Sequence, residues 1–194
     1  MPDIGQAPGE LRKLQAFVNT LDIEQGTDTL ATPAALDDWL GSAGLCDPSA
    51  ADRSGPADVA TALELREAFR GVLGSHVRHG TPRPAPGGAA ADAAERLASI
   101  AATMRPRLQA YPDGRVGLVP AESGSRAALT RLLLIAAEAD TTGTWCRLKV
   151  CSADDCRWAF YDRSPTRTGC WCSMSGCGSR AKSRAYRNRA ARTA

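Results

Sequence analysis

Apolar residues recur three and four positions apart through much of the first 140 residues, the spacing that gathers them on one side of an α-helix. This pattern predicts helices over residues 10–21, 56–79, 89–103 and 127–140. Thr32 followed by Pro33 is typical of a helix start, because threonine caps the first turn and proline fits the first helical position. A further short helix after Thr32 would bury Leu36, Trp39 and Leu40.

The period changes to strict alternation after Pro106. Leu108 and Ala110 alternate with polar neighbours, residues 112–114 supply a turn, and Val116 and Leu118 alternate again, which predicts a β-hairpin. Residues 80–88 hold three prolines and three glycines, so we expect a mobile loop there. Residues 10–143 are therefore predicted to form a mainly helical domain with one β-hairpin, and the whole chain to be of the mainly α, α+β class.

Alternation returns in residues 145–162, on both sides of a pair of cysteines. Leu148 and Val150 are predicted to lie opposite Arg147 and Lys149, and Trp158 and Phe160 opposite Arg157 and Ala159. Cys151 and Cys156 would then lie at the tip of a second hairpin, whose turn is residues 152–155.

A second cysteine pair repeats the spacing of the first, with four residues between Cys172 and Cys177. Ser173 or Ser175 can cap a helix that starts here, so the second pair is predicted at a helix N-terminus. A hairpin tip and a helix start bring four thiolates together, as in a tetrahedral zinc site made of four cysteines. The predicted ligands of one structural zinc ion are Cys151, Cys156, Cys172 and Cys177.

Disulfides are the alternative for these cysteines. The N-terminal residues lack the basic start and apolar stretch of a signal peptide, and no run of eighteen apolar residues is present. We therefore expect a cytoplasmic protein with reduced thiols, in which paired cysteines bind metal more often than they cross-link. Cys146 also lies five residues before Cys151, but we interpret Cys146 and Cys170 as spare thiols, and Cys46 has no assigned role.

Charge divides the chain into two unlike parts. Residues 145–194 hold 11 of the 24 Lys and Arg and only 3 of the 21 Asp and Glu, a net charge of +8, which leaves −5 on residues 1–144. No acidic residue follows Asp162, and Arg180, Arg184 and Arg187 form one stripe on the predicted C-terminal helix. This charge favours duplex DNA as the partner, with RNA or the chain's own acidic part as alternatives.

Residues 10–143 contain little that points to catalysis. A glycine-rich phosphate loop, a GxSxG elbow and an HExxH motif are all missing from the sequence. His76 and His79 are spaced to share a metal, although solvated positions at a helix end are the simpler interpretation. Arg66, Asp22 and Asn19 are polar residues within apolar stretches, and we interpret them as helix-surface or capping residues. We therefore predict that the protein is not an enzyme.

Several motifs together resemble a known family. The CGNR zinc finger is resembled by three features of the C-terminal part: the first cysteine pair with its four-residue gap, FYDRS (160–164) and WCSMSGCGSRAK (171–182). In bacterial transcription regulators an ABATE domain precedes this finger. The earlier part resembles that domain in FVNTLD (17–22), LATPAALDDWLGSAGL (30–45) and ALELREAFRGVL (62–73). The resemblance implies an ABATE-like domain over residues 10–143 and a zinc-finger domain over residues 145–194.

The same resemblance implies a zinc-containing DNA-binding regulator whose four cysteines hold the metal. The candidate DNA contacts are Arg163, Arg167, Ser179, Arg180, Lys182, Arg184 and Arg187. Ser179 stands where the family motif has Asn, and serine lacks the amide that could read adenine. The N-terminal domain would bind a small-molecule effector or form a homodimer, and the protein would lie on the nucleoid when bound to DNA. An RNA-binding or protein-interaction module, or a sensor without DNA contact, remains the alternative.

Overall fold

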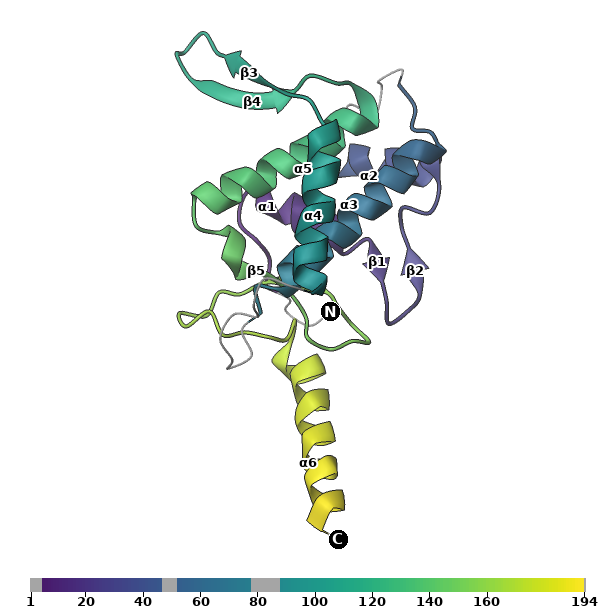
Figure 1. Cartoon of the computed structure of the whole chain (residues 1–194), viewed down its shortest axis with the longest axis vertical. Coiled ribbons are helices and arrows are strands. Elements are labelled where there is room, and N and C mark those ends of the chain that lie inside the picture. Colours follow the sequence, from purple (N-terminus) through teal and green to yellow (C-terminus); the bar gives the residue numbers. More distant parts are fainter. Residues whose placement is uncertain (1–4, 47–51, 78–87, 194) are drawn as a thin grey trace.

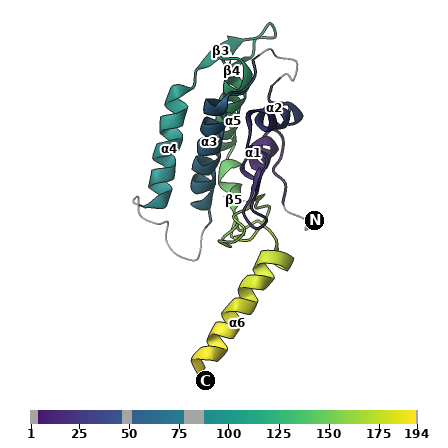
Figure 2. The same ribbon diagram turned by 90° about the vertical axis from the view of Figure 1, so that its right-hand side faces the viewer.

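The computed structural model describes residues 5–46, 52–77 and 88–193 of the 194-residue chain (Figure 1). The described residues form a helical body from which one C-terminal helix projects, in both Figure 1 and Figure 2. The helices are α1 (Leu11–Val18), α2 (Pro33–Ser42), α3 (Pro56–Gly74), α4 (Ala89–Thr103), α5 (Gly124–Thr141) and α6 (Ser179–Thr193).

Three antiparallel hairpins and two short helical turns, Trp145–Arg147 and Met174–Gly178, complete the described secondary structure. The hairpins are β1 (Leu21–Asp22) with β2 (Thr27–Asp28), β3 (Pro106–Ala110) with β4 (Val116–Pro120), and β5 (Leu148–Val150) with β6 (Ala159–Tyr161). The mixed α+β class is as predicted. The hairpin β1–β2 was not predicted, so the body holds two described hairpins rather than one. Its strands have two residues each, too short for an alternating pattern.

The helix boundaries follow local signals in the sequence. Thr32 caps α2, since its hydroxyl accepts a hydrogen bond from the Ala35 amide at 3.2 Å, and Pro33 occupies the first turn. Helix α4 spans residues 89–103 as predicted, whereas α3 ends at Gly74 and not at residue 79. His79 and most of the proline-rich loop at 80–88 lie outside the described residues.

One continuous core joins the helices to the hairpin β5–β6. Its fully buried side chains include Leu14, Phe17, Leu36, Leu40, Leu65, Phe69, Leu129, Leu132 and Leu148. Helix α4 packs against α3 through small residues, and Figure 2 shows the two ribbons side by side. A Cβ at Gly71 would lie 2.5 Å from Cβ of Ala93, so this close approach requires glycine on α3.

The hairpin β5–β6 is buried on both of its faces. Val150 pairs with Ala159 and Leu148 with Tyr161, and these four side chains lie against the body. Lys149 pairs with Phe160 on the opposite face, where both are nevertheless almost fully buried. The loop that carries Arg167 and Gly169 covers this second face, because their carbonyl groups accept hydrogen bonds from Lys149.

Two arginines of α3 are buried, which corrects the interpretation of Arg66 as a surface residue. Arg66 is 3% exposed and holds Asp28 with two hydrogen bonds of 2.7 and 2.8 Å. Arg70, also 3% exposed, donates to the Val18 carbonyl at 2.6 Å and to the Arg157 carbonyl at 2.8 Å. Buried guanidinium groups need such partners. Arg66 thus fastens β2 to α3, and Arg70 fastens α1 and the hairpin tip to it.

The other two polar residues singled out in the body have structural partners. Asn19 ends α1, and its side-chain amide donates to the Ala159 carbonyl at 3.0 Å and accepts from the Ala159 amide at 2.7 Å. Asp22 accepts a hydrogen bond from the Gln25 amide in the β1–β2 turn, as a capping residue does. No described helix is long and apolar enough to cross a membrane.

Candidate metal centre

The first cysteine pair lies at the two ends of the β5–β6 turn. The Cys151 amide donates to the Trp158 carbonyl at 2.9 Å, and the Cys156 amide donates to the Ala153 carbonyl at 3.0 Å. Arg157 follows with a φ of 52°, a left-handed conformation that turns the chain sharply after Cys156. Both thiols therefore lie at one tip, as the spacing predicted.

The second cysteine pair lies where the chain enters α6. Cys177 is part of a π-helical turn, Met174–Gly178, that leads into α6, and Cys172 lies just before it. Ser173 caps this turn, since its hydroxyl accepts from the Gly176 amide at 3.2 Å. Ser179 donates to the Met174 carbonyl at 3.0 Å and so braces the same turn.

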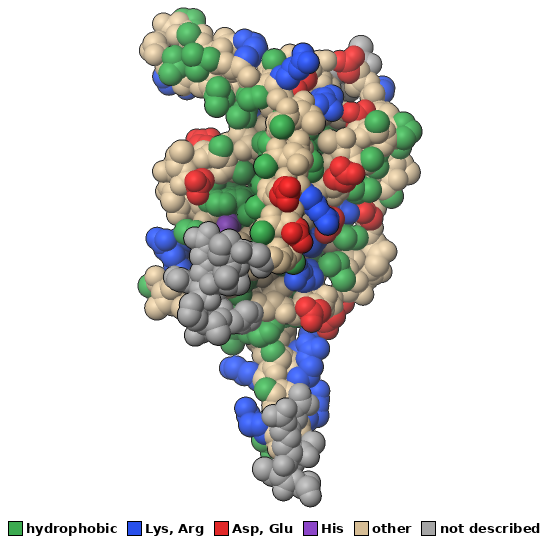
Figure 3. All heavy atoms as spheres, in the orientation of Figure 1, with side chains coloured by type: hydrophobic (Ala, Val, Ile, Leu, Met, Phe, Trp, Pro, Cys, Tyr) green, Lys and Arg blue, Asp and Glu red, His purple; other side chains and the backbone are tan. Residues whose placement is uncertain are grey.

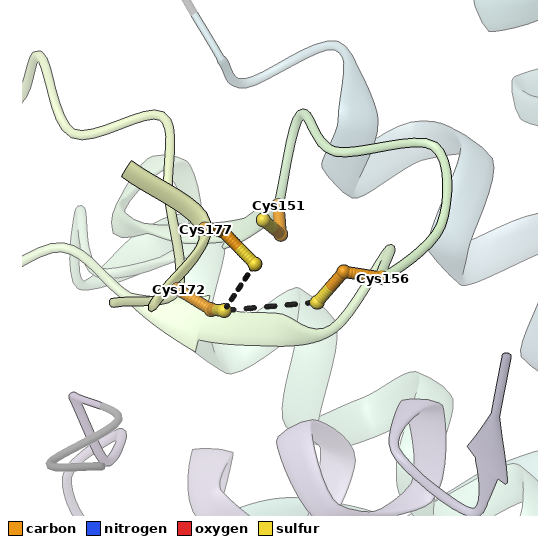
Figure 4. A group of neighbouring side chains, drawn as sticks. All are labelled: Cys151, Cys156, Cys172 and Cys177. Atoms are coloured by element: carbon orange, nitrogen blue, oxygen red, sulfur yellow. Dashed lines mark hydrogen bonds between the residues drawn. The ribbon is translucent and has the colours of Figure 1, made fainter. Parts of the chain in front are cut away.

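The four predicted ligands converge on one point (Figure 4). All four sulfur atoms lie within 4.8 Å of one another, and the Cys156–Cys172 and Cys172–Cys177 sulfur pairs are 3.7 Å apart. A zinc ion with Zn–S bonds of about 2.3 Å has sulfur atoms about 3.8 Å apart along each edge of its tetrahedron. The donor set and its spacing therefore fit one zinc ion.

The thiols also compete for protons in a way that suits a cation. Hydrogen bonds from Cys156 and Cys172 lower the pKa of Cys151 to about 2. The bond to Cys151 raises the pKa of Cys156 to about 12 and also raises the pKa of Cys172. The Cys151 thiolate thus forms easily, and the Cys156 and Cys172 thiols keep their protons beside it. A divalent cation removes this conflict because it stabilises all four as thiolates.

The loop between the two pairs is held by a buried ion pair. Lys149 is 1% exposed, and its ammonium donates to Asp162 Oδ2 at 2.7 Å, to the Arg167 carbonyl at 2.6 Å and to the Gly169 carbonyl at 3.2 Å. Asp162 also accepts from the amides of Ser164 and Gly169. The pair thus fixes the path of residues 162–170, which lead directly to Cys172.

The remaining described thiols and His76 lie outside the cluster. Cys146 is exposed, with Arg167 Nη1 3.5 Å from its sulfur, and Cys170 is half-buried. Neither belongs to the four-cysteine group. His76 Nδ1 lies 2.8 Å from the Leu148 carbonyl oxygen, and its ring packs on Trp145. Burial lowers the pKa of His76, so it is a packed residue rather than a solvated one.

The predicted nucleic-acid contacts have different surroundings. Arg163 donates to the Gln6 carbonyl at 3.0 Å and Arg167 contacts Cys146, and both residues are exposed. Arg180 pairs with Glu24 at 2.6 Å, and Arg184 lies 3.8 Å from Asp155. Lys182 and Arg187 are exposed on α6. Figure 3 shows basic side chains along the projecting helix and acidic ones on the body.

An open groove of about 700 Å³ lies between the metal centre, the β1–β2 hairpin and α6. Asp22 and Glu24 line one side, and Arg180, Arg184 and Arg187 line another. Trp158 adds an aromatic surface to the lining. The sequence did not reveal this groove, because the residues that form it come from segments far apart in the chain.

Comparison with family models agrees with this organisation. Residues 13–143 match the ABATE family, described as "Putative stress-induced transcription regulator", and residues 147–190 match the CGNR zinc finger. The two matches follow one another in the order that the sequence motifs indicated, and neither is an enzyme family. No curated protein matches the chain.

Proposed function

The chain belongs to the ABATE family and ends in a CGNR zinc finger, and from this premise we propose that it is a DNA-binding transcriptional regulator. In this proposal α6 docks on duplex DNA, the zinc centre holds α6 in place, and the body receives the signal. Regulation by binding requires no catalytic residue, so we propose no enzymatic activity.

The projection of α6 is the observation that carries the proposal. The helix has 15 residues, about 22 Å of length, and extends away from the body in both ribbon views. Its basic residues are Arg180, Lys182, Arg184, Arg187, Arg189 and Arg192, and its sequence contains no acidic residue. The DNA major groove admits a helix of this kind, and lysine or arginine side chains displace counterions from phosphates.

Zinc contributes folding energy in this scheme. Four sulfur ligands fill a tetrahedron and leave no position for a reacting water. The ion would tie the β5–β6 tip to the turn that starts α6, which residues with little apolar surface cannot do alone. The apolar residues packed around the thiols are few, namely Ala153, Trp158 and Trp171. They form a small cluster separate from the core that β5 and β6 share with the body.

We propose further that residues 10–143 act as a sensor or dimerisation domain for the finger at residues 145–194. Helices α1 and α3 contact the finger directly, since Gln15 and Asn19 donate to the Ala159 carbonyl and Arg70 to the Arg157 carbonyl. A ligand that displaced either helix would therefore shift the hairpin that carries Cys151 and Cys156. The finger would act in the cytoplasm, on the nucleoid when it is bound to DNA.

A second candidate is a small-molecule sensor that does not contact DNA. The groove beside the metal centre favours it, because its volume lies in the range of ligand pockets and it places charged groups next to Trp158. A ligand there would engage the basic helix instead of a nucleic acid.

Selection from random nucleic-acid pools separates these candidates. The zinc-loaded protein would be challenged with a random duplex DNA pool and, in parallel, with a random RNA pool. Enrichment of a duplex motif supports the proposed regulator. Enrichment from the RNA pool alone, or retention of neither pool, contradicts it and leaves the RNA-binding or sensor alternative.

A further inference from the structure

The side chain of Arg180 contacts the metal centre directly. Its Nη2 lies 3.1 Å from the sulfur of Cys177 and donates to it. The same guanidinium donates to Glu24 Oε1 at 2.6 Å and to Glu24 Oε2 at 3.4 Å. Arg180 therefore joins a zinc ligand to the β1–β2 hairpin of the body.

The contact between Arg180 and Cys177 offsets negative charge at the predicted zinc site. Four thiolates and one Zn²⁺ together leave an excess of negative charge, and Cys177 is only 3% exposed. Water reaches this sulfur poorly, so a cationic donor is the available means of offsetting its charge. Hydrogen bonds to charged groups are roughly twice as strong as those between neutral groups.

Glu24 fixes the direction of the guanidinium. An unpaired arginine side chain samples many rotamers, whereas the carboxylate of Glu24 accepts from both terminal nitrogens of Arg180 and so keeps Nη2 next to Cys177. Glu24 and Arg180 are both partly exposed, so their ion pair by itself contributes little stability. Its effect is to orient Arg180 toward the sulfur.

We propose that Arg180 is a positioning residue of the metal centre and not a nucleic-acid contact. This role rests on the proposed function in one respect only. If α6 binds DNA, the residues that face the DNA are those beyond Arg180. Ser179 supports the same division, since its hydroxyl is committed to the Met174 carbonyl. Residues 177–180 thus build the zinc site, and the residues that follow them form the binding face.

Zinc retention tests the proposal independently of any nucleic acid. Arg180→Ala, Arg180→Lys and Arg187→Ala would each be loaded with zinc, and the zinc affinity measured by competition with a chromophoric chelator. Arg187 is the matched control, since it lies on the same stripe of α6 about two turns farther on. Removal of a residue that contacts a metal ligand costs about 10–100-fold in metal affinity. We expect that loss for Arg180→Ala, a smaller loss for Arg180→Lys, and none for Arg187→Ala.

Glu24→Gln provides a variant that leaves α6 untouched. It keeps a hydrogen-bonding group but removes the charge that orients Arg180, so we expect a weaker zinc affinity than in the parent and a stronger one than in Arg180→Ala. Circular dichroism of each zinc-loaded variant checks that α6 is folded.

Parental zinc affinity in both Arg180→Ala and Glu24→Gln would overturn the proposal. Failure of the proposed function gives a different result, because a parent that binds no DNA would still lose zinc affinity on Arg180→Ala. Conversely, unchanged zinc affinity with weakened DNA binding in Arg180→Ala would make Arg180 a nucleic-acid contact.

Discussion

Two ion pairs with the same N–O distance but opposite burial allow a sharp test of what holds the finger together. Lys149 and Asp162 are 2.7 Å apart with side chains 1% and 4% exposed, and Arg115 and Asp113 are 2.7 Å apart with side chains 74% and 53% exposed. Asp162→Asn keeps the shape of the side chain but leaves the Lys149 ammonium buried without a counter-charge. Breaking a buried pair in this way costs about 3–5 kcal/mol, whereas an exposed pair contributes about 0.2–1 kcal/mol.

Urea unfolding of the zinc-loaded protein, followed by tryptophan fluorescence, measures the two costs. We expect Asp162→Asn to lower the free energy of unfolding by about 3–5 kcal/mol and Asp113→Asn by less than about 1 kcal/mol. Unfolding of Asp162→Asn and Asp113→Asn at the same urea concentration would contradict this expectation, because burial would then have no effect on the strength of an ion pair.

The carboxylate of Asp162 also makes the stability of the finger depend on pH, in a direction that follows from its lowered pKa. Burial alone would raise the pKa of Asp162, but hydrogen bonds from Lys149, Ser164 and Gly169 lower it to about 2, below the ordinary value of 3.8. Its contribution to stability is therefore complete above pH 3.8 and is lost as the pH falls toward 2. Asp162→Asn should lack this part of the acid-side decrease.

The remaining predictions concern helix packing, the contact between body and finger, and the metal. Gly71→Ala should lower the unfolding free energy by about 1–3 kcal/mol, because the added Cβ meets Ala93, and thermal melting would detect this. Gly117→Ala is its control, since a Cβ there meets Tyr111 at an ordinary 3.7 Å. Asn19→Ala should cost about 1–3 kcal/mol in chemical unfolding, because the Ala159 amide loses its partner. Chelation should expose Trp158 to a fluorescence quencher while most helical circular dichroism persists; an unchanged quenching rate would contradict a structural metal.

The parts of the fold that the sequence predicted are those set by local chemistry. Helix α4 and the β3–β4 hairpin follow directly from residue spacing and turn residues. The cysteine cluster could also be predicted from the sequence. Two pairs with the same gap, one at a turn and one before a helix, have few ways to combine. The helix, the hairpin and each cysteine pair depend on residues that are close neighbours in the chain, and only the meeting of the two pairs depends on a longer connection.

The errors concern charged residues whose partners are distant in sequence. Arg66 is a surface residue by local pattern, but Asp28 reaches it from 38 positions away. Lys149 alternates with apolar residues, a pattern that does not reveal its burial, because the loop that carries Asp162 and Gly169 folds over it. Charge is a guide to exposure only where no loop supplies counter-charges and carbonyl groups.

The site residues divide in the same way. Sequence spacing predicted that Arg180, Arg184 and Arg187 share one face, and all three do line the same groove. Spacing could not reveal that Arg180 bonds to Cys177, or that Ser179 bonds back to the π-helical turn. These contacts depend on how the turn at Met174–Gly178 enters α6, which only the three-dimensional structure specifies.

The central claim is that the zinc centre holds α6 so that its basic side chains bind duplex DNA. The most direct test is the salt dependence of duplex binding for the zinc-loaded parent and for a variant with Lys182, Arg184 and Arg187 changed to alanine. Each phosphate contact contributes about 0.9 to the slope of log affinity against log salt concentration. We expect weaker binding by the variant and a slope smaller by about one for each lost contact. Equal affinity and equal slope for parent and variant would contradict the claim.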